Sequence, residues 1–121
     1  MLIDKDGINR RILNAPIIDL WEILVPTSNK KAKGYLYKSY SDKDHKKWDE
    51  FVKNISGGIT IMRTAKGEWE SPTGEQYMDR VIPVRMLCTV PQIKKIIDFT
   101  KKYYEQEVIM AYKVSNEIIM Y

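Results

Sequence analysis

The segment Ser41–Gly58, with the sequence SDKDHKKWDEFVKNISGG, contains a helix with both ends marked, and it decides the fold class. Ser41 suits the N-cap position, and Asp44 three residues later completes a variant of the capping box. The apolar side chains that follow recur at i, i+3, i+4 and i+7, so they share one stripe of a helix over about 42–55. They are Trp48, Phe51, Val52 and Ile55. The two glycines at the end stop the helix, because glycine takes the left-handed C-cap conformation without strain.

A strand is expected on each side of this helix. The stretch 17–25, IIDLWEILV, is apolar at odd and even positions alike, which is typical of a central strand. Pro26 ends it, because proline cannot donate to a strand ladder. A long connection then leads to the helix, and the stretch 58–63 after the helix alternates in the manner of a second strand. These segments form a strand–helix–strand unit.

The same plan repeats in the second half of the chain. The glycines and proline of 64–76 predict a long hairpin connection, or a ribbon closed by the Ser-Pro-Thr-Gly turn. A strand rich in Val, Ile and Met follows at 77–88. Thr89 and Gln92 form a second capping box at the start of a helix over 91–106.

The last strand is expected at 107–115, with a short strand at 117–121 that folds back or extends the same edge. The order strand, helix, strand, strand, helix, strand predicts an α+β protein with a ferredoxin-like βαββαβ sandwich, in which both helices pack on one face of an antiparallel sheet. Right-handed crossovers place the first strand beside the third at the centre. We expect one domain over 17–121, preceded by a lead-in over 1–16.

The composition is that of an ordinary folded protein. Of 121 residues, 44% are hydrophobic and 30% are charged, which excludes a disordered chain. One cysteine cannot form an internal disulfide, so a disulfide-framed secreted scaffold is excluded as well. No apolar run approaches the roughly 20 residues of a membrane-spanning helix, and the acidic start does not match a signal peptide. We therefore expect a cytoplasmic protein with no membrane partner.

The spacing of structural residues over 17–115 resembles that of small bacterial ferredoxin-like domains, which share a double-glycine strand, a Gly-x-Trp hairpin and a Gln-x-x-Val final strand. The matching positions are Gly57–Ile61, Gly67, Trp69, Gly74, Val81 and Gln106–Val108. The layout is also similar to that of nitrogen-regulatory and copper-tolerance trimers, whose long loop after the second strand contacts ligands. These resemblances imply the ferredoxin-like fold and oligomerisation, and they carry over no catalytic residue.

Assembly into a homo-oligomer is expected from the strands themselves. In the first strand, Trp21, Ile23 and Val25 alternate with other large apolar residues, namely Ile18, Leu20 and Leu24. Two helices can cover only one face of the sheet, so the second face is left apolar and uncovered. Such patches mark interaction sites, and we therefore predict homo-oligomerisation through the sheet face or a sheet edge.

The hairpin over 63–76 holds the candidate residues for binding a ligand or a partner, which are Trp69, Glu68, Glu70 and Arg63. A tryptophan between two glutamates in a glycine-bounded ribbon has few routes to burial inside its own domain. The alternative is that Trp69 covers the sheet or completes a dimer interface. Acidic residues of the hairpin also suit Mg²⁺, but basic residues in the same stretch explain them equally well as cross-strand ion pairs.

The loop over 30–40 interleaves basic and aromatic residues, and its four lysines equal the whole net charge of +4. Lysines follow phosphates and tyrosines stack on bases, so the loop suits single-stranded nucleic acid. The candidate nucleic-acid contacts are Lys30, Lys31, Lys33, Tyr35 and Tyr37. The alternative interpretation is a solvated loop whose tyrosines pack over a helix end.

No pattern identifies a catalytic residue, a metal site or a cofactor site. His45 and Cys88 are the only residues of their kinds, too few for a tetrahedral metal shell. We interpret His45 as a helix residue near the surface and Cys88 as a small buried apolar residue. The first hypothesis is thus a non-enzymatic, oligomeric domain that binds a small ligand or a protein. The second is a nucleic-acid-associated protein or nuclease, as in mobile elements, and the third is a hydrolase using His45 or the acidic hairpin.

Overall fold

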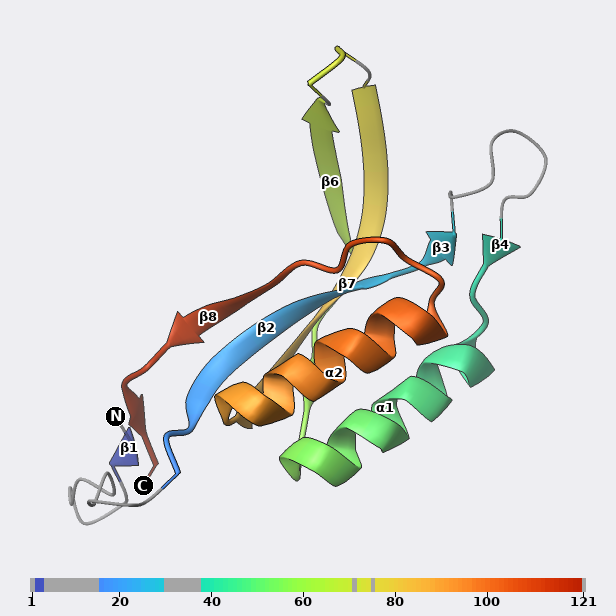
Figure 1. The fold of residues 1–121 in the computed structure, drawn as a ribbon. Helices are drawn as coiled ribbons and strands as arrows, with labels where there is room; N and C mark the ends of the chain where they lie inside the picture. Colours follow the sequence, from blue (N-terminus) through green and yellow to red (C-terminus); the bar gives the residue numbers. More distant parts are fainter. Residues whose placement is uncertain (1, 4–15, 30–37, 71, 75, 121) are drawn as a thin grey trace.

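Two helices cover one face of an antiparallel sheet in the computed structural model, which describes residues 2–3, 16–29, 38–70, 72–74 and 76–120 (Figure 1). The helices are α1 (Asp42–Ser56) and α2 (Val90–Tyr103). The strands are β1 (Leu2–Ile3), β2 (Asp19–Pro26), β3 (Ser28–Asn29), β4 (Lys38–Ser39), β5 (Thr60–Ile61), β6 (Ala65–Glu70), β7 (Gln76–Cys88), β8 (Ala111–Ser115) and β9 (Ile118–Ile119). The order β2-α1-β5-β7-α2-β8 is that of the ferredoxin-like fold, which confirms the predicted α+β class.

The strands of the sheet lie in the predicted order. β2 and β7 pair at the centre, β5 borders β7, and β8 borders β2, all of them antiparallel. The first βαβ strand thus lies beside the third, as right-handed crossovers require. β9 pairs in parallel with β1, in a short ribbon beyond the end of β8 (Figure 1). The expected short strand is present, but it pairs with β1 and does not extend the edge of the five-stranded sheet.

The hairpin made by β6 and the outer half of β7 stands off the sheet as an arm, defined here as residues 65–81 (Figure 1). This confirms the predicted ribbon. The break between β5 and β6 lies opposite Pro83: the amide of Met62 donates to the Pro83 carbonyl at 2.9 Å, but proline has no N–H to return. Because the ladder fails there, β5 spans two residues instead of the predicted 58–63.

The helices begin at both predicted capping boxes. The Ser41 hydroxyl accepts from the Asp44 amide at 3.2 Å, while the Ser41 amide donates to the Asp44 carboxylate at 2.9 Å. Thr89 and Gln92 make the same reciprocal pair at the start of α2. Each box satisfies amides that have no partner within the helix, so these local signals fix the helix starts.

The two helices end differently. Gly57 closes α1 in the left-handed conformation (φ 85°), as the sequence predicts. α2 ends at Tyr103, earlier than the predicted 91–106, because Tyr104 leaves helical geometry and Glu105 takes a positive φ of 52°. The last strand is also shorter than predicted, since regular pairing of β8 with β2 begins only at Ala111.

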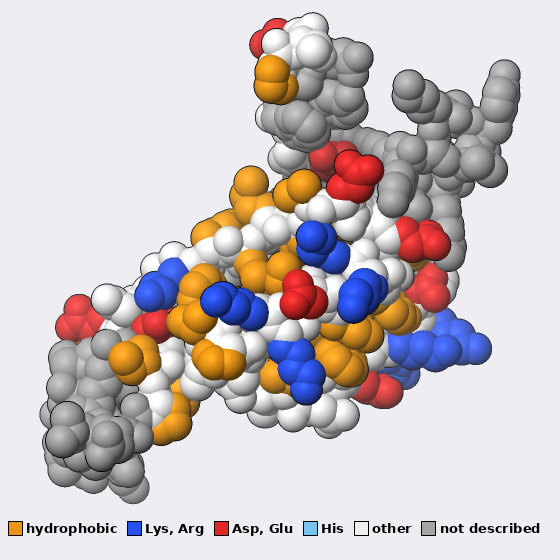
Figure 2. All heavy atoms as spheres, in the orientation of Figure 1, with side chains coloured by type: hydrophobic (Ala, Val, Ile, Leu, Met, Phe, Trp, Pro, Cys, Tyr) orange, Lys and Arg blue, Asp and Glu red, His pale blue; other side chains and the backbone are white. Residues whose placement is uncertain are grey.

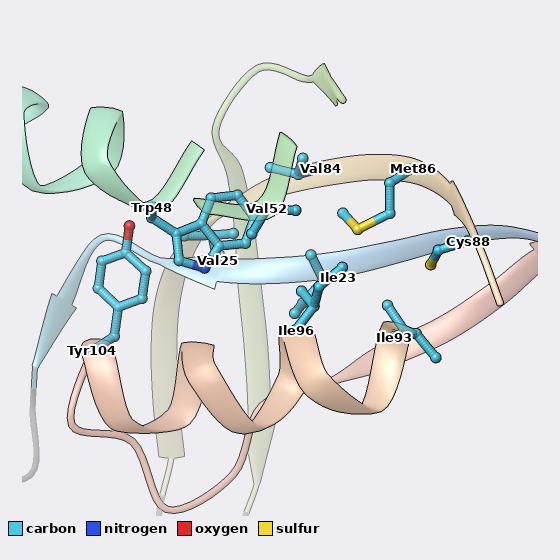
Figure 3. Packing of buried hydrophobic residues seen from close by; sticks show 10 residues of the cluster. All are labelled: Ile23, Val25, Trp48, Val52, Val84, Met86, Cys88, Ile93, Ile96 and Tyr104. Carbon is cyan, nitrogen blue, oxygen red and sulfur yellow. The ribbon is translucent and has the colours of Figure 1, made fainter. Parts of the chain in front are cut away.

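The core lies between the sheet and the helices (Figure 3). Its buried apolar residues come from the inward positions of β2 and β7 and the inner stripes of both helices: Ile23, Val25, Trp48, Val52, Val84, Met86, Cys88, Ile93, Ile96 and Tyr104. Trp48 also joins the helices by a polar contact, because its Nε1 donates to the Thr100 hydroxyl at 2.9 Å. That hydroxyl in turn donates to the Ile96 carbonyl at 2.6 Å. The inner stripe predicted for the first helix is therefore confirmed, since Trp48 and Val52 are buried and Phe51 and Ile55 pack against the core.

Among the described residues, neither helix has the length and apolar character needed to cross a membrane.

Candidate functional site

A polar row crosses the sheet on the face away from the helices, here called the open face. In the strand register Thr60 lies opposite Arg85, Arg85 opposite Glu22, and Glu22 opposite Tyr112. Their neighbours along the strands, such as Ile23 and Val84, belong to the core under the helices. Because side chains alternate along a strand, the row itself points to the open face.

Glu22 is the centre of this row. Its Oε1 accepts from Arg85 Nε at 2.8 Å, and its Oε2 accepts from the Tyr112 hydroxyl. Although Glu22 lies on a face that no helix covers, the residue is only 6% exposed. A carboxylate removed from water in this way is stable only when charged or hydrogen-bonding partners hold it. Arg85 and Tyr112 are those partners, so the three side chains form one hydrogen-bonded unit.

Apolar residues lie on both sides of the polar row. Leu20 pairs with Leu87 on one side, and Leu24 pairs with Pro83 on the other. Met110 continues the second group, since its carbonyl accepts from the Leu24 amide and it lies two residues before Tyr112. Met110 is 61% exposed. The open face thus combines exposed apolar side chains with a fixed ionic centre, which fits an interaction surface better than plain solvated surface.

A groove of about 580 Å³ lies beside Arg85 at one end of the sheet. Its walls come from the turn after α1, from β2, β5 and β7, and from the segment around β9. The lining residues include Leu20, Gly57, Gly58, Thr60, Arg85, Leu87, Ile118 and Met120. Arg85 is the one charged residue in this lining, within the described part of the chain. The groove is therefore mostly apolar with a single cationic group.

The residues predicted from the hairpin sequence lie on or beside the arm, away from this row. Glu68 and Glu70 are two apart in β6 and so share one side of the ribbon, with Trp69 between them. Glu68 makes an ion pair with Lys66 at 3.0 Å, and Arg63 lies exposed just before the arm. Glu68 is opposite Met78, seven residues along β7 from Arg85, which is roughly 23 Å at the usual rise of a strand. One chain does not bring the two groups together.

Two parts of the predicted sites lie outside the residues and side chains that the structure describes. The side chain of Trp69 is one, and the whole of 30–37, with Lys30, Lys31, Lys33, Tyr35 and Tyr37, is the other. Over the helices, acidic side chains lie among the Lys and Arg side chains (Figure 2). The nucleic-acid hypothesis stays a prediction of the loop sequence.

His45 packs into an aromatic cluster where α1 begins and α2 ends. Its Nδ1 lies 2.6 Å from the hydroxyl of Tyr104, which is fully buried. The Tyr40 hydroxyl donates to the Tyr104 carbonyl, and the Tyr103 hydroxyl donates to the Asp44 carbonyl at 2.7 Å. These hydrogen bonds join the start of α1 to the end of α2. Burial raises the pKa of Tyr104, so its hydroxyl stays protonated, and His45 is partly buried as its sequence context indicated.

The partly buried position of His45 in this aromatic cluster predicts that the stability of the fold depends on pH. Burial lowers the pKa of His45 below its ordinary 6.5, although Asp49, Asp44 and Asp42 of α1 act in the opposite direction. The folded protein thus binds the proton more weakly than the unfolded chain, so the stabilisation is complete above pH 6.5 and is lost as the pH falls below it. We expect the free energy of unfolding to decrease from pH 7 to pH 5 in urea titrations. His45→Gln, which keeps a hydrogen-bond acceptor but cannot titrate, should show a smaller decrease; an equal decrease would contradict the assignment.

Within the described residues, we find neither a reactive thiolate nor a cluster of three or more metal-binding side chains. Cys88 is buried, and burial raises the pKa of its thiol to about 11, so it is not a thiolate at neutral pH. No group of three or more His, Cys, Asp or Glu within the described ranges is arranged to hold a metal ion.

Sequence reasoning missed the Glu22, Arg85 and Tyr112 unit. Its members are 63 and 90 residues apart, so no local motif contains them. One signal was present, since Glu22 is an acid inside the apolar run of the central strand. A charged residue on a central strand needs a partner on a neighbouring strand, and Arg85 and Tyr112 lie on the two neighbours.

No family model matches the chain, and no curated protein matches it. Solved structures do resemble it. A divalent cation tolerance protein, CutA1, from Thermus thermophilus is 12% identical, with 81% of this chain and 82% of that chain covered and a TM-score of 0.58. CutA1 from Oryza sativa is 9% identical, with 79% and 76% covered and a TM-score of 0.56.

A phage SAM lyase in complex with S-methyl-5'-thioadenosine is 11% identical to this chain. The match covers 91% of this chain and 90% of the lyase, with a TM-score of 0.60. At such identities the likeness shows the ferredoxin-like fold alone. It confirms at the level of fold the similarity to copper-tolerance proteins that the sequence layout indicated.

Proposed function

We propose that this protein is a homo-oligomeric domain that binds a small ligand, with copies packed through the open face of the sheet. The observation that carries the proposal is the fixed unit of Glu22, Arg85 and Tyr112 among exposed apolar residues. Within the described part of the chain, no helix covers this surface. A second copy covers the apolar residues and encloses the ionic centre.

A second copy of this chain is the partner that best suits this surface. The face is self-sufficient in charge, because Arg85 balances Glu22, so two copies can approach without repulsion from the centre. Exposed apolar side chains such as Met62 and Met110 then lose water on contact, which is the main favourable term in association. The resemblance to copper-tolerance trimers in the layout of the chain points the same way.

The arm is the second part of the proposed ligand site. It projects beyond the body of its own chain (Figure 1), so in an oligomer it reaches toward a neighbouring copy. We propose that Trp69, Glu68, Glu70 and Arg63 contact the ligand or the neighbouring copy there. The lyase with this fold is in complex with S-methyl-5'-thioadenosine, which makes an adenine nucleoside the first ligand to test.

The test is calorimetric titration of the oligomer with S-methyl-5'-thioadenosine. We expect saturable binding, and Trp69→Ala should weaken it about 5-fold or more while circular dichroism shows an unchanged fold, because loss of a stacked aromatic contact costs about 1–3 kcal/mol. Val90→Ala, at an exposed apolar site on the helix side, is the matched control and should bind as the wild type does. Equal binding by Trp69→Ala would remove Trp69 from the site, and no binding at millimolar ligand would exclude this nucleoside.

The second candidate function is cleavage of S-adenosylmethionine, which the coverage of nearly the whole lyase chain favours. Incubation of the protein with S-adenosylmethionine and chromatography of the products tests it. Release of S-methyl-5'-thioadenosine above the uncatalysed rate would make the protein an enzyme. Binding of the nucleoside without release leaves the non-enzymatic ligand-binding domain as the function.

A further inference from the structure

We infer that the groove beside Arg85 binds an oxyanion, a carboxylate or phosphate group, attached to an apolar body. This site goes beyond the proposed function, because S-methyl-5'-thioadenosine carries no carboxylate or phosphate and the arm does not line this groove. It concerns a groove built by one chain, between the turn after α1 and the segment around β9.

The guanidinium of Arg85 is held in a fixed direction. Its Nε donates to Glu22 Oε1 at 2.8 Å, and the other oxygen of that carboxylate is taken by Tyr112. The two terminal nitrogens of Arg85 make no hydrogen bond within the described part of the chain. A guanidinium anchored through Nε keeps a fork of N–H donors whose geometry matches a carboxylate or phosphate.

The rest of the lining fixes the other half of the ligand. Leu20 and Leu87 form an apolar wall, and Ile118 and Met120 form another from the segment around β9. Thr60, opposite Arg85, adds a hydroxyl at the same end. The terminal nitrogens of Arg85 can only donate hydrogen bonds, so they favour an acceptor such as an oxyanion over a cation. The apolar walls select a ligand with a hydrocarbon or aromatic part.

Gly58 offers a way to close this groove without touching the charge. A Cβ built at Gly58 meets nothing within 4 Å, and its φ lies outside the left-handed region. A side chain at this position therefore extends into open space without backbone strain. Gly57 differs, because its φ of 85° makes any substitution there strained.

The experiment uses hexanoate and hexyl phosphate as probes, with neutral 1-hexanol as the control ligand, titrated into ¹⁵N-labelled full-length protein. We expect both anions to shift the amides of Gly57, Gly58 and Thr60, and 1-hexanol to bind at least 10-fold more weakly. Arg85→Gln should lose at least 10-fold in affinity, and Arg85→Lys should fall between it and the wild type. Lys94→Gln, which removes a charge from the outer face of α2, should bind as the wild type does.

Gly58→Phe keeps Arg85 and should abolish the shifts, so the inference remains falsifiable if Arg85→Gln is unfolded. Binding of 1-hexanol as tight as that of hexanoate would overturn it, as would full affinity in Arg85→Gln or Gly58→Phe. The mass of each variant in solution is measured in parallel by light scattering. A wild-type oligomer that does not bind the anions contradicts the groove alone, whereas a wild-type monomer that binds them contradicts the proposed assembly alone.

Discussion

Met110→Glu is expected to convert the oligomer into monomers. Met110 is an exposed apolar side chain on the open face, and in the proposed assembly it lies against a neighbouring copy. A carboxylate at this position must lose its water without gaining a partner, which costs several kcal/mol. We therefore expect the dissociation constant of the oligomer to rise about 100-fold or more, since each 1.4 kcal/mol is a factor of ten.

The matched control is Val90→Glu. Val90 is also exposed and apolar, but it lies in the first turn of α2, where an acid interacts favourably with the helix dipole. Size-exclusion chromatography with light scattering over a dilution series should show the wild-type mass for Val90→Glu and a smaller mass for Met110→Glu. An unchanged mass in Met110→Glu would mean that the copies meet through another surface.

Trp48→Ala should remove a large share of the folding free energy. Trp48 is 1% exposed, packs between the helices and the sheet, and donates to the buried Thr100 hydroxyl (Figure 3). Replacement of a buried tryptophan by alanine typically costs about 3–5 kcal/mol, against a total of about 5–15 kcal/mol for a protein of this kind. Urea denaturation followed by circular dichroism measures the loss.

Two further variants separate the causes of that loss. Thr100→Val keeps the indole but leaves its N–H without an acceptor, and should cost about 1–3 kcal/mol. Lys47→Ala, on the exposed side of the same helix, should change stability by less than about 0.5 kcal/mol. A loss below about 1 kcal/mol for Trp48→Ala would contradict the role of Trp48 in joining the helices.

Local signals predicted most of the fold. The capping boxes at Ser41 and Thr89 and the apolar stripe of α1 act within a few residues, so a single sequence reveals them. The order of strands followed from the handedness of crossovers, which is a general property of chains. The errors lie where residues distant in sequence determine the length or the pairing of a strand. β5 is cut short opposite Pro83, and β9 pairs with β1 at the other end of the chain.

The candidate site was harder to predict for the same reason. Alternation in the first strand correctly indicated an uncovered second face, but it did not say which residues of β7 and β8 would meet Glu22. That depends on register, and a shift of one residue would turn Arg85 to the core side. Trp69 and its neighbours were chosen from composition alone, and their role stays a proposal.

Sedimentation equilibrium of the wild-type protein over a wide range of concentration shows whether the copies assemble. One chain has a mass of 14.2 kDa. We expect a whole-number multiple of that mass at micromolar concentration, and we expect it to be insensitive to salt because the proposed interface is mainly apolar. A mass of one chain at every concentration would contradict the assembly through the open face and, with it, a ligand site shared between copies.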